Sequence, residues 1–167
     1  MKFKLVFLAL LFSMCSNVTQ EASKEIRVVS LSTTHTEIIQ SLEAEETLIA
    51  VDSFSEVDFP VEVIDAYTVT AEELAPLNPD VVILAFDFNG IVEGLENQEI
   101  NYVLLPPAKN FEDVYSQIET IGSIVNKESE AFSTARDMKV EINRILDNAN
   151  YGNTCLLYTS PSPRDRG

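Results

Sequence analysis

Small polar and aromatic side chains follow two short apolar runs near the start of the chain, and these side chains could bind a small molecule. The first group spans residues 32–35 and the second spans residues 52–54. Hydroxyl and backbone N–H groups can hold the polar rim of a ligand, while aromatic rings pack against flat apolar surfaces. The predicted ligand-binding residues are Ser32, Thr33, Thr34, His35, Asp52, Ser53, Phe54, Tyr67, Phe86 and Phe88. For the three phenylalanines, packing in the core is the alternative.

The same residues lack the partners that catalysis or metal binding requires. Ser30 and Ser32 do not lie in a G-x-S-x-G turn, and a Ser32–His35 pair has no evident third member. His35 is the only histidine, so a zinc or manganese site with three or four such ligands cannot be assembled. The glycine-rich phosphate loops are also missing. We therefore expect no catalytic residue, no metal site and no cofactor. His35 either reaches the ligand or stays solvated or bonded to its loop.

Hydrophobic patterning predicts a scaffold that brings the two polar groups together. Residues 27–32 contain a short β-branched run that ends in small polar residues, as a buried parallel strand does on reaching a loop. Residues 48–51 form the second predicted strand. Between them, Thr34 and Glu37 form a capping-box pattern at the start of an amphipathic helix. Strand, loop, helix and strand in this order place both loops at the carboxyl edge of a parallel sheet, where open α/β sheets bind ligands.

The alternation of strands and helices continues along the chain. The predicted elements are a helix capped by Thr70 with Glu73, a strand at 81–85, a helix capped by Asn89, a strand at 102–105, and a helix capped by Asn110 with Asp113. A long helix over 128–150 follows, with an apolar stripe of Phe132, Ala135, Met138, Ile142 and Ile145. The fold class is therefore α/β: a parallel sheet flanked by helices, one lobe over residues 26–127, followed by a long linker helix.

The first residues have the features of a secretory signal. A basic start precedes an apolar run at 5–12, which is too short to span a bilayer. Residues 11–15 resemble a lipoprotein box in which Cys15 would be lipidated, and ordinary cleavage nearby is the alternative. Residues 16–25 then form a polar tether. We expect an extracytoplasmic protein that touches a membrane only through a lipid anchor on Cys15.

The last residues do not look like natural protein. The run C-L-L-Y-T-S-P-S-P-R-D at 155–165 resembles the in-frame translation of a transposase adapter used in sequencing libraries. A Pro/Ser-rich tail is the alternative. We treat 155–167 as a translated sequencing adapter and expect the natural gene to continue beyond Thr154.

The charge of the chain argues against a nucleic-acid partner. Its formal net charge is −16, with acidic residues dispersed along the sequence. Binding phosphates requires clustered lysines and arginines.

Four sequence blocks together resemble the substrate-binding proteins of ABC importers for cobalamin, ferric siderophores and haem. The block R-V-V-S-L-S-T-T-H-T-E-I at 27–38 resembles the family's opening, and D-S-F-S-E at 52–56 resembles its second loop. A-E-E-L-A-P-L-N-P-D-V-V at 71–82 and V-L-L-P-P-A-K-N-F-E-D-V-Y at 103–115 resemble two later blocks. The second loop departs from the family, because Glu56 stands where an aspartate is usual and lies farther from Pro60.

The resemblance implies a function as well as a fold. A ligand would be held between two lobes joined by the long helix, and Glu72 would dock a monomeric protein onto an ABC permease. In the alternative for Glu72, its charge only complements the helix dipole. The loop at 52–56 favours cobalamin, with a ferric siderophore or haem as the alternative. A flavodoxin- or chelatase-like enzyme is the rival of another class, which the secretory signal disfavours.

Overall fold

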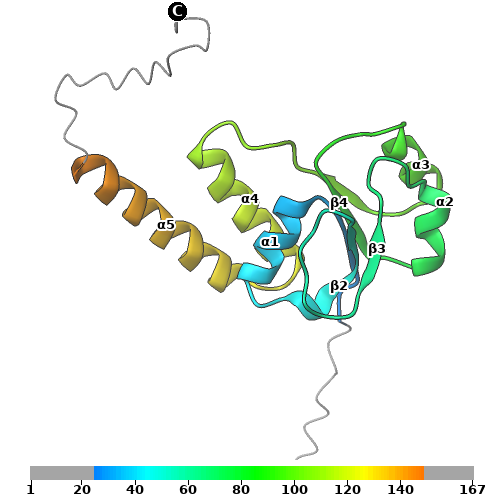
Figure 1. Cartoon of the computed structure of the whole chain (residues 1–167), viewed down its shortest axis with the longest axis horizontal. Coiled ribbons are helices and arrows are strands. Elements are labelled where there is room, and N and C mark those ends of the chain that lie inside the picture. Colours follow the sequence, from blue (N-terminus) through cyan, green and yellow to red (C-terminus); the bar gives the residue numbers. More distant parts are fainter. Residues whose placement is uncertain (1–24, 149–167) are drawn as a thin grey trace, which may run out of the picture.

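The computed structural model describes residues 25–148, which form a five-stranded parallel sheet with helices on both faces (Figure 1). The strand order is β3-β2-β1-β4-β5, and every neighbouring pair is parallel. The strands are β1 (Val28–Leu31), β2 (Leu48–Asp52), β3 (Glu62–Ile64), β4 (Val81–Leu84) and β5 (Tyr102–Leu104). This arrangement confirms the predicted fold class. The predicted signal, the lipidation of Cys15, tether residues 16–24 and the translated adapter lie outside the described residues.

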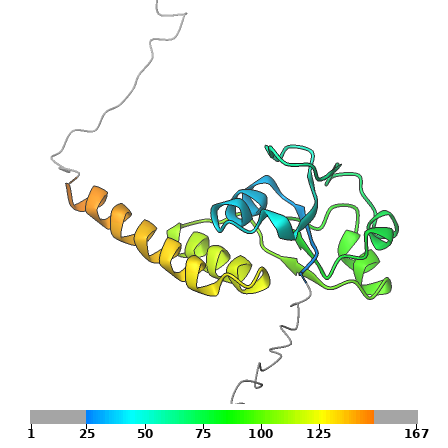
Figure 2. The same cartoon turned by 90° about the horizontal axis from the view of Figure 1, so that it is seen from below.

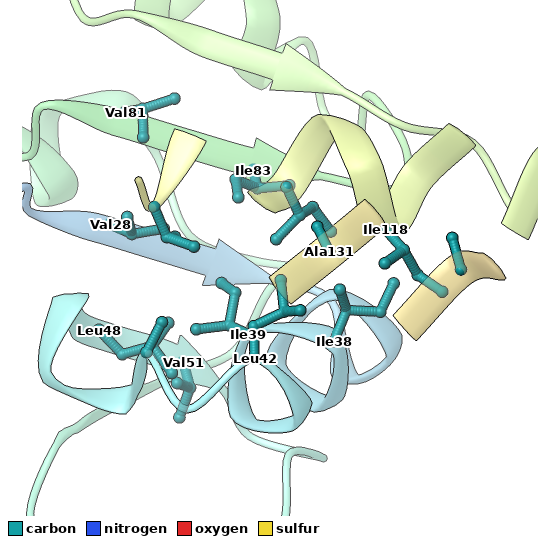
Figure 3. Packing of buried hydrophobic residues seen from close by; sticks show 14 of the residues in the cluster. Val28, Ile38, Ile39, Leu42, Leu48, Val51, Val81, Ile83, Ile118 and Ala131 are labelled. Atoms are coloured by element: carbon teal, nitrogen blue, oxygen red, sulfur yellow. The ribbon is translucent and has the colours of Figure 1, made fainter. Parts of the chain in front are cut away.

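Two separate groups of helices cover the two faces of the sheet (Figures 1 and 2). The helices are α1 (Thr33–Ser41), α2 (Ala71–Leu74), α3 (Ile91–Asn97), α4 (Phe111–Ile124) and α5 (Glu128–Asn148), with short 3-10 helices at Glu45–Thr47 and Ala75–Leu77. Alternate residues of β1 face opposite ways: Val28 packs with α1 and α4, and Val29 packs with α2 and α3. Figure 3 shows the first of these layers, where Val28 and Ile83 of the sheet meet Ile39 of α1. Among the described residues, no helix is long and apolar enough to cross a membrane.

The edge strand β3 is the one strand that the sequence did not predict. Both β1 and β4 are buried along their whole length, as central strands of a parallel sheet should be. In β3, by contrast, Glu62 and Val63 are exposed and only Ile64 is partly buried. A three-residue edge strand that leaves one charged and one apolar side chain in solvent has no hydrophobic pattern to detect.

The predicted capping box at the start of α1 is wrong. The helix begins at Thr33, Ser32 is its N-cap, and no side chain caps it. Because β1 ends at Leu31, one residue separates strand from helix, and Thr34 falls inside the first turn. The Thr36 N–H donates to the Ser32 carbonyl at 3.0 Å, which closes the first helical turn.

The other predicted caps have mixed outcomes. Thr70 with Glu73 forms the predicted capping box of α2, and Asn110 accepts a bond from the Asp113 N–H at 3.0 Å at the start of α4. Asn89, however, does not cap α3. Gly90 is the N-cap with a φ of 72°, and the Asp87 carboxylate instead accepts from the Val92 N–H at 3.1 Å. The Asn89 side chain instead donates from its Nδ2 to the Tyr67 carbonyl at 2.6 Å.

Helix α5 is present, but the predicted apolar stripe is only partly its packing face. Small residues, Ala131 and Ala135, are buried against the rest of the lobe, and Ile142 is partly buried there. The larger Phe132 and Ile145 are exposed. The helix therefore approaches α4 closely through small side chains and leaves larger apolar ones uncovered.

Arg27 holds together the opposite, amino-terminal edge of the sheet. Its Nη2 donates to the Leu77 carbonyl at 2.8 Å and its Nε to the Asn78 carbonyl at 3.1 Å. We expect Arg27→Met to lower the free energy of unfolding by about 1–2 kcal/mol, because two charge-assisted hydrogen bonds are lost. Urea unfolding would measure the loss. Arg27→Lys keeps the positive charge but cannot donate to both carbonyl oxygens as the guanidinium group does. If that variant were as stable as the parent chain, the two hydrogen bonds would not be the source of the stabilisation.

Candidate functional site

A concavity of about 690 Å3 opens at the carboxyl edge of the sheet. Its rim is formed by the segments that follow β1, β2, β3 and β4, and its side by α1, α4 and α5. Nine of the ten predicted ligand-binding residues line it: Ser32, Thr33, Thr34, His35, Asp52, Phe54, Tyr67, Phe86 and Phe88. The geometry therefore brings together predicted residues that lie up to 56 positions apart in the sequence.

A buried hydroxyl network fixes the first two loops to each other. Thr36 Oγ1 lies 2.9 Å from Ser30 Oγ, and Ser55 Oγ lies 3.1 Å from Thr36 Oγ1. Thr36 and Ser55 were not among the predicted site residues, although small hydroxyl residues within both polar loops were the available signal. Their bonds hold the loops in one arrangement, which suits a preformed binding surface.

Asp52 joins three segments of the site. Its side chain is buried, its Oδ1 accepts from the Ala66 N–H at 3.3 Å, and its Oδ2 lies 3.5 Å from Thr33 Oγ1. The carboxylate also lies beside the amino-terminal turn of α1, where a negative charge is favourable. Asp52 is therefore a positioning residue for the loops around it.

Ser53 is the predicted residue that does not line the concavity. It is exposed, and its N–H donates to the Ile64 carbonyl at 2.7 Å. Since successive side chains alternate at the end of a strand, Asp52 faces the site and Ser53 faces away.

Four aromatic rings form a continuous group at the mouth of the concavity. The ring centroids of Tyr67 and Phe88 are 4.6 Å apart, those of Phe86 and Phe88 are 5.3 Å apart, and Phe54 meets Tyr67 edge-on at 6.3 Å. Phe54 is 67% exposed, Tyr67 is 53% exposed and Phe86 is 49% exposed. Core packing is therefore excluded for Phe54 and Phe86. A group of exposed rings on one rim is an apolar surface that a ligand can cover.

His35 lies beneath this surface. It is only 2% exposed, and its Nδ1 has no hydrogen-bond partner. Burial lowers the pKa of the imidazole to about 4, opposed by a hydrogen bond with the backbone of Leu105. The ring is therefore neutral at neutral pH. Of the outcomes weighed from the sequence, solvation is wrong, and the ring bonds the backbone of Leu105 instead of its own loop. Contact with a ligand stays a prediction.

Sequence reasoning missed the helical wall of the concavity. Gln117 of α4 lines it while its Nε2 donates to the Pro106 carbonyl at 2.6 Å. Thr134 and Met138 of α5 line it as well. The spacing of four between these two residues places them on one face of a helix, which was the signal available. Loop-based reasoning could not show that α5 reaches the carboxyl edge.

Two further predicted features can be placed. Glu72 is exposed in the first turn of α2, where its charge also complements the helix dipole. Within residues 25–148, no group of three or more histidine, cysteine, aspartate or glutamate side chains could hold a metal ion.

Comparison with known proteins adds a family and a set of similar folds. A family model described as periplasmic binding protein matches residues 28–154. No curated protein matches the chain.

Solved structures share the fold of this chain. The periplasmic haem-binding protein HutB of Vibrio cholerae is 24% identical with a TM-score of 0.67, over 77% of this chain and 52% of its own. A possible iron-binding (periplasmic solute-binding) protein from Staphylococcus epidermidis is 20% identical with a TM-score of 0.64, and the match covers 75% of this chain and 52% of that protein. A protein of an ABC-type Fe3+-hydroxamate transport system from Saccharomonospora viridis is 19% identical with a TM-score of 0.56, and the match covers 72% of this chain and 50% of that protein. The chain thus spans about half the length of these proteins.

Proposed function

Because the chain belongs to the periplasmic binding protein family, we propose that it supplies one lobe of an extracytoplasmic protein that captures a metal chelate and delivers it to an ABC permease. The ligand lies over the concavity at the carboxyl edge of the sheet and is enclosed by a second lobe. The protein acts as a monomeric binding protein and not as an enzyme. It reaches the membrane only through a lipid on Cys15.

The exposed aromatic group is the observation that carries this proposal. Phe54, Tyr67, Phe86 and Phe88 form one contiguous group of rings. Phe54, Tyr67 and Phe86 are exposed, and Phe88 is partly buried among them. Such rings offer a broad apolar surface to a large, flat or rounded ligand, while the hydroxyls of Ser32 and Thr34 offer polar contacts at its margin.

Cobalamin is our first choice of ligand. The loop at 52–56 resembles the cobalamin-binding branch of the importers, and a corrin presents a flat ring with amide groups along its rim. A ferric siderophore or haem is the alternative, and the printed names of the similar structures, a haem-binding protein and an Fe3+-hydroxamate transport protein, favour that alternative.

Two surfaces support the assembly that this mechanism needs. The uncovered apolar side chains of α5, among them Val140, Ile145 and Leu146, suit packing against a second lobe. Glu72 is exposed at the start of α2, where it is available to pair with arginines of a permease.

Loss of the aromatic rim should weaken ligand binding without unfolding the lobe. We expect Phe54→Ser and Phe86→Ser each to reduce affinity by roughly tenfold, since about half or more of each side chain is in solvent and available to the ligand. The measurement is a titration of the 15N-labelled chain with cyanocobalamin, haemin and a ferric hydroxamate, followed by NMR. Binding by this single lobe should be weaker than micromolar.

Phe132→Ser is the matched control, because Phe132 is 60% exposed on α5 and does not line the concavity. That variant should bind like the parent chain. If none of the three chelates shifts resonances around the concavity, the proposed function is wrong. Sub-micromolar binding would instead contradict the two-lobe mechanism.

A further inference from the structure

The ionisable side chains that line the concavity carry only negative charge. Glu37 of α1 lines the concavity and is exposed. Asp52 also lines it and is buried. Among the described residues that line the concavity, none is a lysine or an arginine.

The basic side chains of the described residues are placed elsewhere. Arg27 lies at the opposite edge of the sheet, and Lys127 lies in the turn between α4 and α5. Three others on α5 already have acidic partners: Arg136 with Asp137, Lys139 with Glu112, and Arg144 with Glu141. Lys109 follows the lining residue Ala108 but does not itself line the concavity.

The amino terminus of α1 does not replace the missing cations. A helix amino terminus attracts anions, and that of α1 lies at the concavity. The carboxylate of Asp52 already lies there, with its Oδ2 3.5 Å from Thr33 Oγ1. The positive end of the helix dipole of α1 is therefore already balanced by the Asp52 carboxylate. A negatively charged group of a ligand would gain little there and would be repelled by Glu37.

We propose that the concavity selects metal chelates that carry no net negative charge, so that neutral and cationic chelates bind and anionic ones are rejected. This inference rests on the proposed function and names the charge class of its ligand. A carboxylate or catecholate rim would lose water on entering and find no lysine or arginine among the described residues that line the concavity. An amide rim or an ammonium group would find hydroxyl and carboxylate acceptors.

Two ligand series of constant shape would test the proposal. The first is cyanocobalamin with one rim amide intact, hydrolysed to a carboxylate, or coupled to ethylenediamine. The second is the gallium(III) complex of desferrioxamine B with its amine free, acetylated or succinylated. In the first series these three forms are neutral, negative and positive in turn, and in the second they are positive, neutral and negative. The body of the chelate is unchanged within each series. Affinities come from NMR titration of the full chain at low ionic strength.

In whichever series binds, the cation should bind roughly tenfold more tightly than the anion, with the neutral chelate between them. Glu37→Lys should reverse this order. Glu46→Lys is the matched control, because it makes the same charge change in the 3-10 helix before β2, at the opposite edge of the sheet. It should leave the order unchanged.

The failures are distinguishable. Equal affinity across a series, or tighter binding of the anion, overturns the charge selection and leaves the proposed function intact. An equal response to Glu37→Lys and Glu46→Lys overturns it too, because the preference would then reflect the net charge of the whole chain. Binding of haemin alone, whose rim carries two carboxylates, overturns the charge selection and leaves the proposed function intact. Absence of binding by both series and by haemin overturns the proposed function, and the charge selection with it.

Discussion

Replacing Gly122 with alanine should lower the free energy of unfolding by about 1–2 kcal/mol. A Cβ at Gly122 would overlap the methyl group of Ala131 and approach the Lys127 carbonyl oxygen at 3.1 Å. Alanine normally stabilises a helix by about 1 kcal/mol relative to glycine, but forced overpacking of a core costs about 1–3 kcal/mol and here involves backbone that cannot rotate away. We expect the cost of the steric overlap to exceed the gain in helix propensity, and urea unfolding would measure the net change in the free energy of unfolding.

Two further variants test the cause of this loss. Ser123→Ala lies next to Gly122 on the exposed side of α4, so it should cause no loss of stability. Ala131→Gly should partly rescue Gly122→Ala, with a coupling energy of about 1 kcal/mol or more in a double-mutant cycle. Strictly additive effects would show that the contact between α4 and α5 is not the cause. Because Thr134 and Met138 line the concavity, separating the two helices should also weaken ligand binding.

Acidification from pH 7 to pH 5 should destabilise the lobe by about 2 kcal/mol through His35 alone. Burial lowers the pKa of this imidazole from 6.5 to about 4 in the folded state. Between these values the unfolded chain binds the proton and the folded chain does not, so unfolding takes up a proton. The contribution of His35 to the free energy of unfolding is therefore complete above pH 6.5 and decreases as the pH falls. About 3 kcal/mol of it is lost below pH 4.

His35 can be followed without ambiguity, because it is the only histidine of the chain. Its ring resonances should titrate near pH 4, and a midpoint near 6.5 would mean that the imidazole is solvated in the folded protein. Many carboxylates also titrate below pH 5, so the comparison needs a variant. His35→Gln can still donate to the Leu105 backbone and has no imidazole to protonate. Its stability should change by about 2 kcal/mol less than that of the parent between pH 7 and pH 5.

The sequence alone determined those features of the lobe that depend on nearby residues. The buried strand at Val81–Leu84 is a continuous apolar run, and that at Val28–Leu31 is apolar except for Ser30. The caps at Thr70 and Asn110 join groups three residues apart. The position of two polar loops at one sheet edge also followed, because strand, helix and strand in a parallel sheet permit one arrangement. These local rules were enough to predict the fold class, and nine of the ten residues predicted to bind the ligand line the concavity.

Only the tertiary structure decided which side chains are covered. The burial of His35 and the exposure of Phe132 each depend on segments far away in the chain, whose approach sets the local solvation. The helical wall formed by Gln117 and Met138 exists because Gly122 and Ala131 let α4 and α5 pack closely. A periodic pattern marks an apolar face, but the shape of the neighbouring element determines whether large or small side chains on that face are buried.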